Sequence, residues 1–337
     1  MEVTFAICCR NGEKHLAQVV GALLQQKGVD PSRWEILLID NGSTDATRAI
    51  FEQFQHPGLD GLSLEPKPSL RVVVEPVAGQ RSARTCAIQN ARGTWICFVD
   101  DDNVLADNYL LRGLEFALSA AEAGAFGGGS VAKLSAPSPR HFDGFASALA
   151  IWQGGDAVRK IGLGRKFTAG MYVRRVAALD AMNEPWLMPG RTPICEFGGE
   201  DAELCMQLVR NGWKIYYVPG LTFEHVIPQS RTGLGYLMGL RARQGGEELM
   251  LKLAYAERRR PLFIEWLNLM ALAIVKMILF SLMFLVVTRR RRWKSLSRAF
   301  FLAGYIRFTV AALRKAAEFR RRSVKTCGPP IGKAQCA

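Results

Sequence analysis

The stretch Trp34-Glu-Ile-Leu-Leu-Ile-Asp-Asn-Gly-Ser-Thr-Asp45 joins a run of apolar residues to a polar turn. The run is almost wholly apolar, which is typical of a strand buried on both faces of a parallel sheet. The turn is rich in residues that bend the chain, and either Thr44 or Asp45 can cap a helix over Ala46–Phe54. The stretch therefore predicts a strand, a polar turn at its carboxyl end and a helix.

The same alternation extends to both sides of this stretch. Further apolar runs predict strands, and residues with helical spacing predict helices between them. A sheet built from repeated strand–helix–strand units is mainly parallel and doubly wound, so the expected fold class is α/β. The predicted strands are Val3–Cys9, Leu70–Glu75 and Trp95–Val99, and the predicted helices are Lys14–Gln26 and Ser82–Ala91.

Charge is divided unevenly along the chain. The 337 residues are 49% hydrophobic, which excludes a disordered chain, and their formal net charge is +14. Residues 1–257 contain 26 Lys and Arg against 28 Asp and Glu, whereas residues 258–337 contain 18 against two. We therefore expect a nearly neutral domain over 1–257 and a basic region over 258–337. Nucleic acid is not the expected partner, because the basicity is confined to the second region.

Polar residues follow the predicted strands at their carboxyl ends, where α/β sheets bind ligands. These ends are Cys8–Asn11, Asp40–Ser43 and Asp100–Asn103, and the last two bring carboxylates. Carboxylates suit a bridging metal ion or contacts with a ribose and a base, rather than direct binding of a phosphate. Neither GxGxxG between a strand and a helix nor GxxxxGK[ST] occurs, which disfavours dinucleotide dehydrogenases and P-loop enzymes.

Three consecutive carboxylates, Asp100, Asp101 and Asp102, follow the strand Trp95–Val99. They repel one another unless a cation is present, and oxygen ligands favour Mg²⁺ or Mn²⁺. We therefore expect a divalent metal here. The alternative is a solvated acidic turn that caps a helix beginning near Asp107.

A second acidic motif, Gly198-Gly-Glu-Asp201, begins a predicted helix whose first turn favours carboxylates. One of these carboxylates can accept a proton from an incoming hydroxyl, although acidic first-turn residues also occur for purely structural reasons. His225 follows the apolar strand Ile215–Val218 and is either a metal ligand or a structural histidine. Arg81 and Arg84 lie beside Gly79 at a helix start, where anions bind, or are ordinary surface residues.

Taken together, these segments resemble the family 2 glycosyltransferases with the GT-A fold. The resemblance covers roughly residues 1–245 and rests on six blocks in order rather than on any one motif. The matching blocks are Val3–Asn11, Glu35–Asp45, Gly79–Gly93, Phe98–Asp102, Gly198–Asp201 and His225.

The family implies inverting transfer of a sugar from a nucleotide-diphospho-sugar to a hydroxyl of a lipid-linked or glycan acceptor. By resemblance, Asp201 is the catalytic base, Glu200 is its neighbour on the acceptor side, and 167–175 is an acceptor-side strand. Asp40 reads the base. The implied metal ligands for Mn²⁺ or Mg²⁺ are Asp102, Asp100 and His225. The implied nucleotide-sugar-binding residues are Cys8, Arg10, Asp40, Asn41, Arg84, Asp100 and Asp101.

The basic region contains the apolar segment Leu267–Thr288, whose 22 residues include one charge, Lys276. At about 1.5 Å per residue the segment is long enough to span a bilayer. Basic clusters on both sides, Arg258–Arg260 and Arg289–Arg292, oppose a simple span, because one cluster would be exported. We expect tilted, re-entrant or in-plane helices on an anionic inner leaflet, with a single span or a dimerisation arm as alternatives.

Two further expectations concern location and function. The chain begins without a basic n-region, and its eight cysteines show no CxxC pair, so we expect a reducing, cytoplasmic setting at the cell membrane. The alternatives to a glycosyltransferase are a nucleotidyltransferase on a similar sheet and a non-catalytic adaptor that binds membrane or nucleic acid through the basic region.

Overall fold

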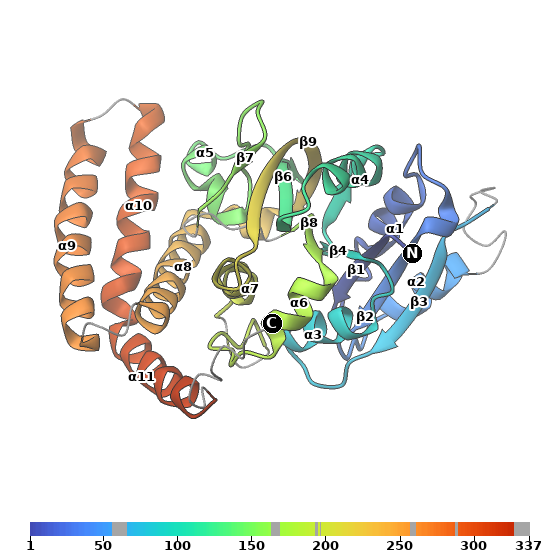
Figure 1. Ribbon diagram of the computed structural model, residues 1–337. Helices are drawn as coiled ribbons and strands as arrows, with labels where there is room; N and C mark the ends of the chain where they lie inside the picture. The colour runs from blue at the N-terminus through green and yellow to red at the C-terminus, as the bar shows by residue number, and fades with distance from the viewer. Residues whose placement is uncertain are drawn as a thin grey trace.

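The protein, seen in a computed structural model, consists of a curved α/β domain with a group of helices packed against one side (Figure 1). The structure describes residues 1–55, 66–162, 169–192, 195, 197–256, 261–286 and 289–326. The acceptor-side strand at 167–175 therefore lies partly outside the described residues, and the basic cluster at 258–260 lies wholly outside them. Residues 287 and 288, at the end of the predicted apolar segment, and the tail beyond Thr326 lie wholly outside them.

Within the described residues, a nine-stranded sheet runs through the α/β domain in the order β3-β2-β1-β4-β8-β6-β9-β5, with β7 paired to β9. The strands β3, β2, β1 and β4 are parallel, as the sequence predicts. Beyond them β8 is antiparallel to both neighbours, so the far half of the sheet is mixed. The strands are β1 Val3–Cys9, β2 Trp34–Asp40, β3 Ser69–Val74, β4 Trp95–Val99, β5 Asn103–Leu105, β6 Ala123–Leu134, β7 Arg159–Lys160, β8 Met171–Arg174 and β9 Lys214–Ile227.

Side chains of successive strand residues point to opposite faces of the sheet, and both faces are covered. In β1, Phe5 and Ile7 pack under α1, α2 and α4, whereas Ala6 packs under α3, α6 and α7. The side chain of Asp45 accepts a hydrogen bond from the backbone of Thr47 at 3.0 Å, so Asp45 is the predicted cap of α2. The helices of this domain are α1 Leu16–Leu24, α2 Thr47–Gln55, α3 Gln80–Asn90, α4 Tyr109–Ser119, α5 Phe142–Phe145, α6 Arg175–Met182 and α7 Glu200–Arg210. Short 3₁₀ helices are η1 Pro31–Arg33, η2 Ala146–Leu149 and η3 Gln229–Arg231.

The helices that follow η3 are α8 Leu234–Tyr255, α9 Leu262–Val286, α10 Arg289–Arg307 and α11 Thr309–Thr326. They share a core with the α/β domain, because Met188 and Ala202 pack in one cluster with Leu253 of α8 and Tyr305 of α10. Close approach of α8 and α10 depends on glycine. A Cβ at Gly245 would overlap the carbonyl oxygen of Phe301.

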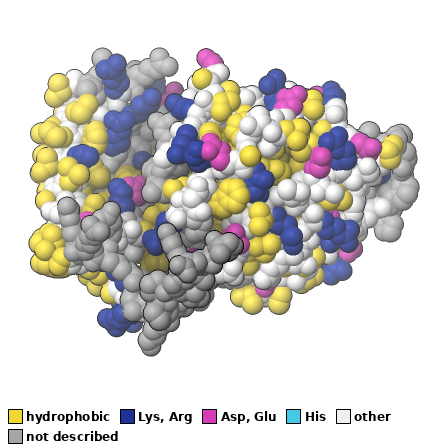
Figure 2. Space-filling model, in the orientation of Figure 1, with side chains coloured by type: hydrophobic (Ala, Val, Ile, Leu, Met, Phe, Trp, Pro, Cys, Tyr) yellow, Lys and Arg dark blue, Asp and Glu magenta, His cyan; other side chains and the backbone are white. Residues whose placement is uncertain are grey.

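Hydrophobic side chains cover the outer face of α9, as Figure 2 shows at the edge of the molecule away from the sheet. Among the described helices, α9 is the one that is long and apolar enough by itself to cross a membrane. The second apolar stretch of the sequence, 299–313, divides between α10 and α11, which meet at an angle of 62°. It is therefore not a second straight span.

Candidate active site

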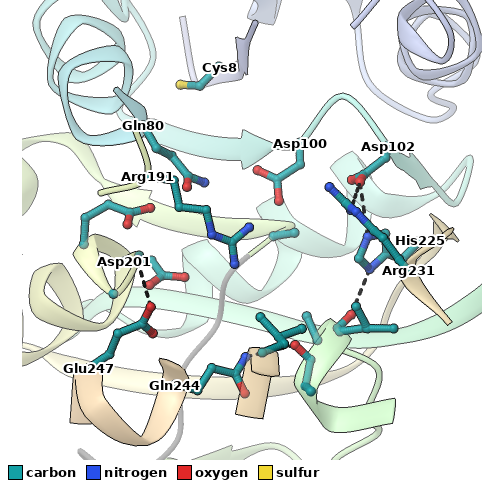
Figure 3. Close-up of a pocket in the computed structure, with 18 of the residues that line it drawn as sticks. Cys8, Gln80, Asp100, Asp102, Arg191, Asp201, His225, Arg231, Gln244 and Glu247 are labelled. Atoms are coloured by element: carbon teal, nitrogen blue, oxygen red, sulfur yellow. Dashed lines mark hydrogen bonds and ion pairs between the residues drawn. The ribbon is translucent and has the colours of Figure 1, made fainter. Parts of the chain in front are cut away.

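A cavity of about 930 Å³ opens where β1 and β4 end, and the start of α7 and one face of α8 complete its walls. This volume lies in the range of pockets that hold small-molecule ligands. Figure 3 shows Asp102, His225 and Arg231 on one side of the cavity and Asp201 and Glu247 on the opposite side. Two motifs far apart in the sequence therefore meet across one cavity.

The residues at the carboxyl ends of β1 and β2 contribute unequally to the cavity. Cys8 and Arg10 line it, and burial raises the pKa of the Cys8 thiol to about 12. Asp40 is aligned with Cys9 in the sheet but does not line the cavity; its Oδ1 accepts a hydrogen bond from the backbone of Ser43 at 2.9 Å. Asp40 therefore stabilises the turn that follows β2.

Asn41 lines the cavity and at the same time holds the loop that leads into α3. Its Nδ2 donates hydrogen bonds to the carbonyls of Glu75 and Val77 at 3.0 and 2.8 Å, and its Oδ1 accepts one from the backbone of Gly79 at 2.7 Å. The polar atoms of the Asn41 side chain are therefore engaged within the protein.

Asp102 and His225 are brought together by strand pairing. Residue 225 lies within β9, opposite Asn103 of β5, and not after the strand as the sequence suggested. The Oδ2 of Asp102 lies 3.3 Å from Nε2 of His225 and 3.1 Å from a guanidinium nitrogen of Arg231. Burial acts to raise the pKa of Asp102, but the charges of His225 and Arg231 outweigh it and lower that pKa.

The tautomer of His225 follows from its second contact. Its Nδ1 lies 2.9 Å from the carbonyl oxygen of Leu149, which can only accept a hydrogen bond. Nδ1 therefore carries a proton. Burial acts to lower the pKa of His225, but the hydrogen bond and charge of Asp102 outweigh it and raise that pKa, which favours the protonated ring with Nε2 donating to Asp102. Only the neutral ring has a lone pair on Nε2. A histidine oriented in this way by a carbonyl is the arrangement found at metal ligands.

The other two carboxylates of the acidic run are Asp100 and Asp101. Nearby positive groups balance their negative charge only in part. Burial, together with the charges of Asp102 and Asp100, raises the pKa of Asp101 to about 6. Burial also raises the pKa of Asp100, although the nearby charge of Arg84 opposes this shift. The Oδ2 of Asp101 accepts a hydrogen bond from the thiol of Cys9 at 3.5 Å.

These residues fit a divalent cation in part. The negative charge of Asp100, Asp101 and Asp102 favours a cation here, and Nε2 of His225 could bind that cation once the ring is neutral. Within the described residues, however, no three His, Cys, Asp or Glu side chains converge closely enough to hold an ion alone. Such an ion would need further ligands, as Mg²⁺ commonly takes from water and substrate phosphates.

The opposite side of the cavity is formed by the first turn of α7. Gly199 precedes it with a φ of +89°, a left-handed conformation that favours glycine. Asp201 is 7% exposed and lines the cavity. Glu200 is 2% exposed, and its Oε2 has no hydrogen-bond partner among the described residues. Burial and the charge of Asp201 raise the pKa of Glu200 to about 7, and Arg84 opposes this shift.

Arg84 connects the two acidic motifs. Its Nε lies 3.5 Å from Glu200, and its Nη2 lies 3.9 Å from Asp100. The guanidinium also lies over the ring of Phe98, at 5.1 Å, and the side chain is buried. Arg84 therefore holds the carboxylates of α7 and β4 in one electrostatic cluster and is not a surface residue.

Several cavity residues were not predicted from the sequence. Arg191 precedes α7, Arg231 lies in η3, and Gln244 and Glu247 lie on α8. The Oε1 of Glu247 accepts a hydrogen bond from the backbone of Gly198 at 2.7 Å, which positions the loop before α7. One local feature of the sequence could have indicated the cavity residues on α8. Polar residues stand beside Gly245 in a helix that otherwise carries many apolar side chains.

Comparisons with known proteins agree with this fold. The family described as glycosyl transferase family 2 matches residues 4–165. The succinoglycan biosynthesis protein ExoM of Rhizobium meliloti is 25% identical over 239 residues, which are 70% of this chain and 71% of that protein.

Two solved structures share the fold at 16% identity. The S. aureus TarS 1–349 complex with UDP-GlcNAc has a TM-score of 0.53, with 97% of this chain and 91% of that chain covered. The mannosyltransferase PcManGT from Pyrobaculum calidifontis, in complex with GDP-Man and Mn²⁺, has a TM-score of 0.54, with 98% and 76% covered. The matched segment contains the parallel strands and the acidic run, so the chain is a glycosyltransferase enzyme whose residues 4–165 match family 2.

Proposed function

We propose that the enzyme transfers a sugar, with inversion, from a nucleotide-diphospho-sugar to a hydroxyl of a lipid-linked or glycan acceptor. The observation that carries this proposal is the placement of Asp201 across one cavity from Asp100 and Asp102. A base that faces the donor from the side opposite its leaving group directs attack at the anomeric carbon from that side, and attack from that side inverts it.

In the proposed reaction, Asp201 accepts the proton of the acceptor hydroxyl as the new glycosidic bond forms. Arg231 and Arg84 supply positive charge near the carboxylates where the leaving nucleoside diphosphate develops its negative charge. Asp102, Asp100 and Nε2 of His225 would hold a Mn²⁺ or Mg²⁺ ion, which supplies further neutralisation of that charge.

The proposed donor site lies at the ends of β1, β2 and β4. Cys8, Arg10 and Asp101 line the cavity there, whereas Asp40 and Asn41 shape the loops around it. The TarS structure contains UDP-GlcNAc and the mannosyltransferase structure contains GDP-Man and Mn²⁺, which supports a nucleotide sugar as the donor class.

We also propose that residues 1–257 are the catalytic part and 258–337 the membrane-association region. The exposed apolar face of α9 and the basic residues of 258–337 support attachment to the anionic inner face of the cell membrane. Transfer at that surface suits an acceptor that is itself linked to lipid.

A donor-binding experiment tests the proposal. The full chain in neutral detergent is heated with a panel of UDP- and GDP-sugars, with and without Mn²⁺. At one hundred times Kd, a bound donor stabilises the protein by about 2.7 kcal/mol, and we expect this only with Mn²⁺ present. Asp102→Ala should remove the Mn²⁺-dependent part, whereas Asp107→Ala, an exposed carboxylate paired with Lys27, should keep it. Equal stabilisation of the Asp102 variant would contradict the metal assignment.

A further inference from the structure

A second cavity, of about 260 Å³, adjoins the active-site cavity on the side away from the strand ends. Ser147 and Arg241 line both cavities, so the two hollows are neighbours. The second cavity lies between the segment 143–151 and α10, the helix that packs along α9 (Figure 1). It therefore lies between the proposed reaction centre and the apolar helix.

Positive charge converges on this second cavity. Arg241 from α8 and Lys294 and Arg298 from α10 line it, and among the described residues Asp143 is its one acidic lining residue. In the part of the chain that the structure describes, no acidic side chain forms an ion pair with any of the three cations. The cavity therefore has an excess of positive charge that an anion would balance.

Arg241 is held in a position that leaves hydrogen-bonding capacity unused. One of its terminal nitrogens donates to Oε1 of Gln244 at 2.9 Å, and its guanidinium lies over the ring of Phe301 at 4.6 Å. Its Nε is buried and has no hydrogen-bond partner among the described residues. Burial lowers the pKa of Arg241 to about 10; the charge of Glu248 opposes this shift and that of Arg298 adds to it.

The walls of the cavity are packed elements, not exposed loops. A Cβ at Gly144 would overlap Trp293, so α5 can approach α10 only because residue 144 is glycine. The ring of His141 packs edge-on against Trp293 at 5.8 Å, and Ser297 on the cavity wall is 2% exposed. Packed helices therefore fix the backbone positions of all three cations, and the side chains of Lys294 and Arg298 are exposed at the cavity.

We propose that this cavity binds the phosphate or diphosphate group of a lipid-linked acceptor, while the acceptor's hydroxyl extends into the active-site cavity toward Asp201. The proposal rests on the proposed function and names the acceptor class for it. Guanidinium groups bind phosphate oxygens with paired, charge-assisted hydrogen bonds, and an ammonium adds a point charge. The donor diphosphate belongs near Asp100 and Asp102, so a second anion site beside α10 and α9 suits the acceptor's lipid end.

Binding of farnesyl diphosphate to the full chain in neutral detergent tests the proposal. Calorimetry compares the wild type with Lys294→Ala/Arg298→Ala and with a control of equal charge, Arg291→Ala/Arg314→Ala, whose two side chains are exposed and outside the cavity. We expect about tenfold weaker binding in the cavity variant and a change below about threefold in the control, with no binding of farnesol. Equal weakening in both variants would show diffuse attraction to a basic surface and would overturn the proposal.

Two further arms separate the possible sources of the phosphate. Short-chain phosphatidylglycerol offered in place of farnesyl diphosphate tests a phospholipid headgroup, and tight binding of this lipid alone would overturn the acceptor assignment. Thermal stabilisation of the wild type by nucleotide sugars is measured separately, without farnesyl diphosphate. Loss of that stabilisation would count against the proposed donor, whereas loss of farnesyl diphosphate binding counts against the second cavity only.

Discussion

Asp201 and Glu200 are neighbours on one turn of α7, yet their surroundings give them different tasks. Both side chains line the cavity, but Asp201 is the more exposed of the two, and its Oδ1 accepts a hydrogen bond from the backbone of Ala202 at 2.7 Å. Glu200 is enclosed beside Arg84, and its Oε2 has no hydrogen-bond partner among the described residues. Asp201, the more exposed carboxylate, is therefore the proposed base, and the proposed contribution of Glu200 is its charge beside Asp201 and Arg84.

The first prediction concerns the base. Asp201→Asn removes the proton acceptor but preserves shape, so kcat should fall by about 10²–10⁴ while donor affinity stays within about threefold. Steady-state kinetics and donor titration measure the two effects. Asp180→Asn, on the exposed face of α6, is the matched control and should leave kcat unchanged. Turnover at the wild-type rate in the Asp201 variant would sink the assignment.

The second prediction concerns the pH dependence of stability. The folded pKa of Glu200 is about 7 against a reference value of 4.5, so between these values the folded state binds more protons than the unfolded state. The contribution of Glu200 to stability therefore falls as pH rises from about 4.5 to 7 and is constant above. Glu200→Gln should stabilise the protein relative to wild type by about 2–3 kcal/mol at pH 8 and by much less at pH 5.

Urea unfolding of the full chain at both pH values measures this difference. Glu115→Gln, on the exposed face of α4, is the control and should show the same pH dependence as the wild type. A difference between Glu200→Gln and wild type that does not change with pH would contradict the prediction.

The sequence identified the candidate site residues that directly follow a strand or begin a helix, because strand ends and helix starts can be recognised from the local sequence. The run Asp100–Asp102 and the pair at Glu200 and Asp201 are examples, and the structure brings them to one cavity. Arg231 and Glu247 were missed because their importance arises from packing across the chain. Nothing in the local sequence shows that η3 approaches β5 or that α8 approaches Gly198.

At the scale of elements, the strands and helices of the amino-terminal half agree closely with those predicted from the hydrophobic pattern. The predicted strand Val3–Cys9 has the observed bounds, and α3 begins only two residues before its predicted start. The second half of the sheet was harder, because β8 runs antiparallel between β4 and β6 and β9 continues through a glycine at residue 220. Strand direction and bends of this kind are decided by long-range pairing.

The third prediction concerns the contact between α8 and α10. Gly245→Ala places a methyl group against the carbonyl of Phe301 and should destabilise the protein by about 1–3 kcal/mol. Gly239→Ala, in the same helix, meets only the end of the Arg243 side chain at 3.7 Å and should be neutral or stabilising by up to about 1 kcal/mol. Thermal unfolding of the two variants measures the contrast. Equal stability of both variants would show that α8 and α10 do not depend on this close approach.

At the scale of the whole molecule, the exposed apolar face of α9 is the feature that supports the proposed membrane association. Exposed side chains on this face include Leu272, Ile278, Leu279 and Leu282, each about half exposed. A continuous apolar surface of this kind marks contact with a membrane or another apolar partner. The charge of 258–337 favours an anionic membrane.

The fourth prediction tests this contact. Ile278→Asp/Leu282→Asp should abolish co-sedimentation of the full chain with phosphatidylglycerol vesicles, because each aspartate costs about 2.5–3.5 kcal/mol at the centre of a spanning helix. Leu118→Asp, at a leucine 85% exposed on α4, should leave sedimentation unchanged. Retained sedimentation of the α9 variant would place the membrane contact elsewhere on the chain.

Phe301 of α10 lines the active-site cavity, and the core around it joins α8 to α11 and to residues near α7. The carboxyl-terminal helices are therefore not an interchangeable anchor. Exchanging them for an unrelated helix would remove the part of the cavity wall that α10 supplies. A fragment that ends at residue 257 would keep the proposed catalytic carboxylates but would lack Phe301 and the rest of α10, so one wall of the cavity would be open.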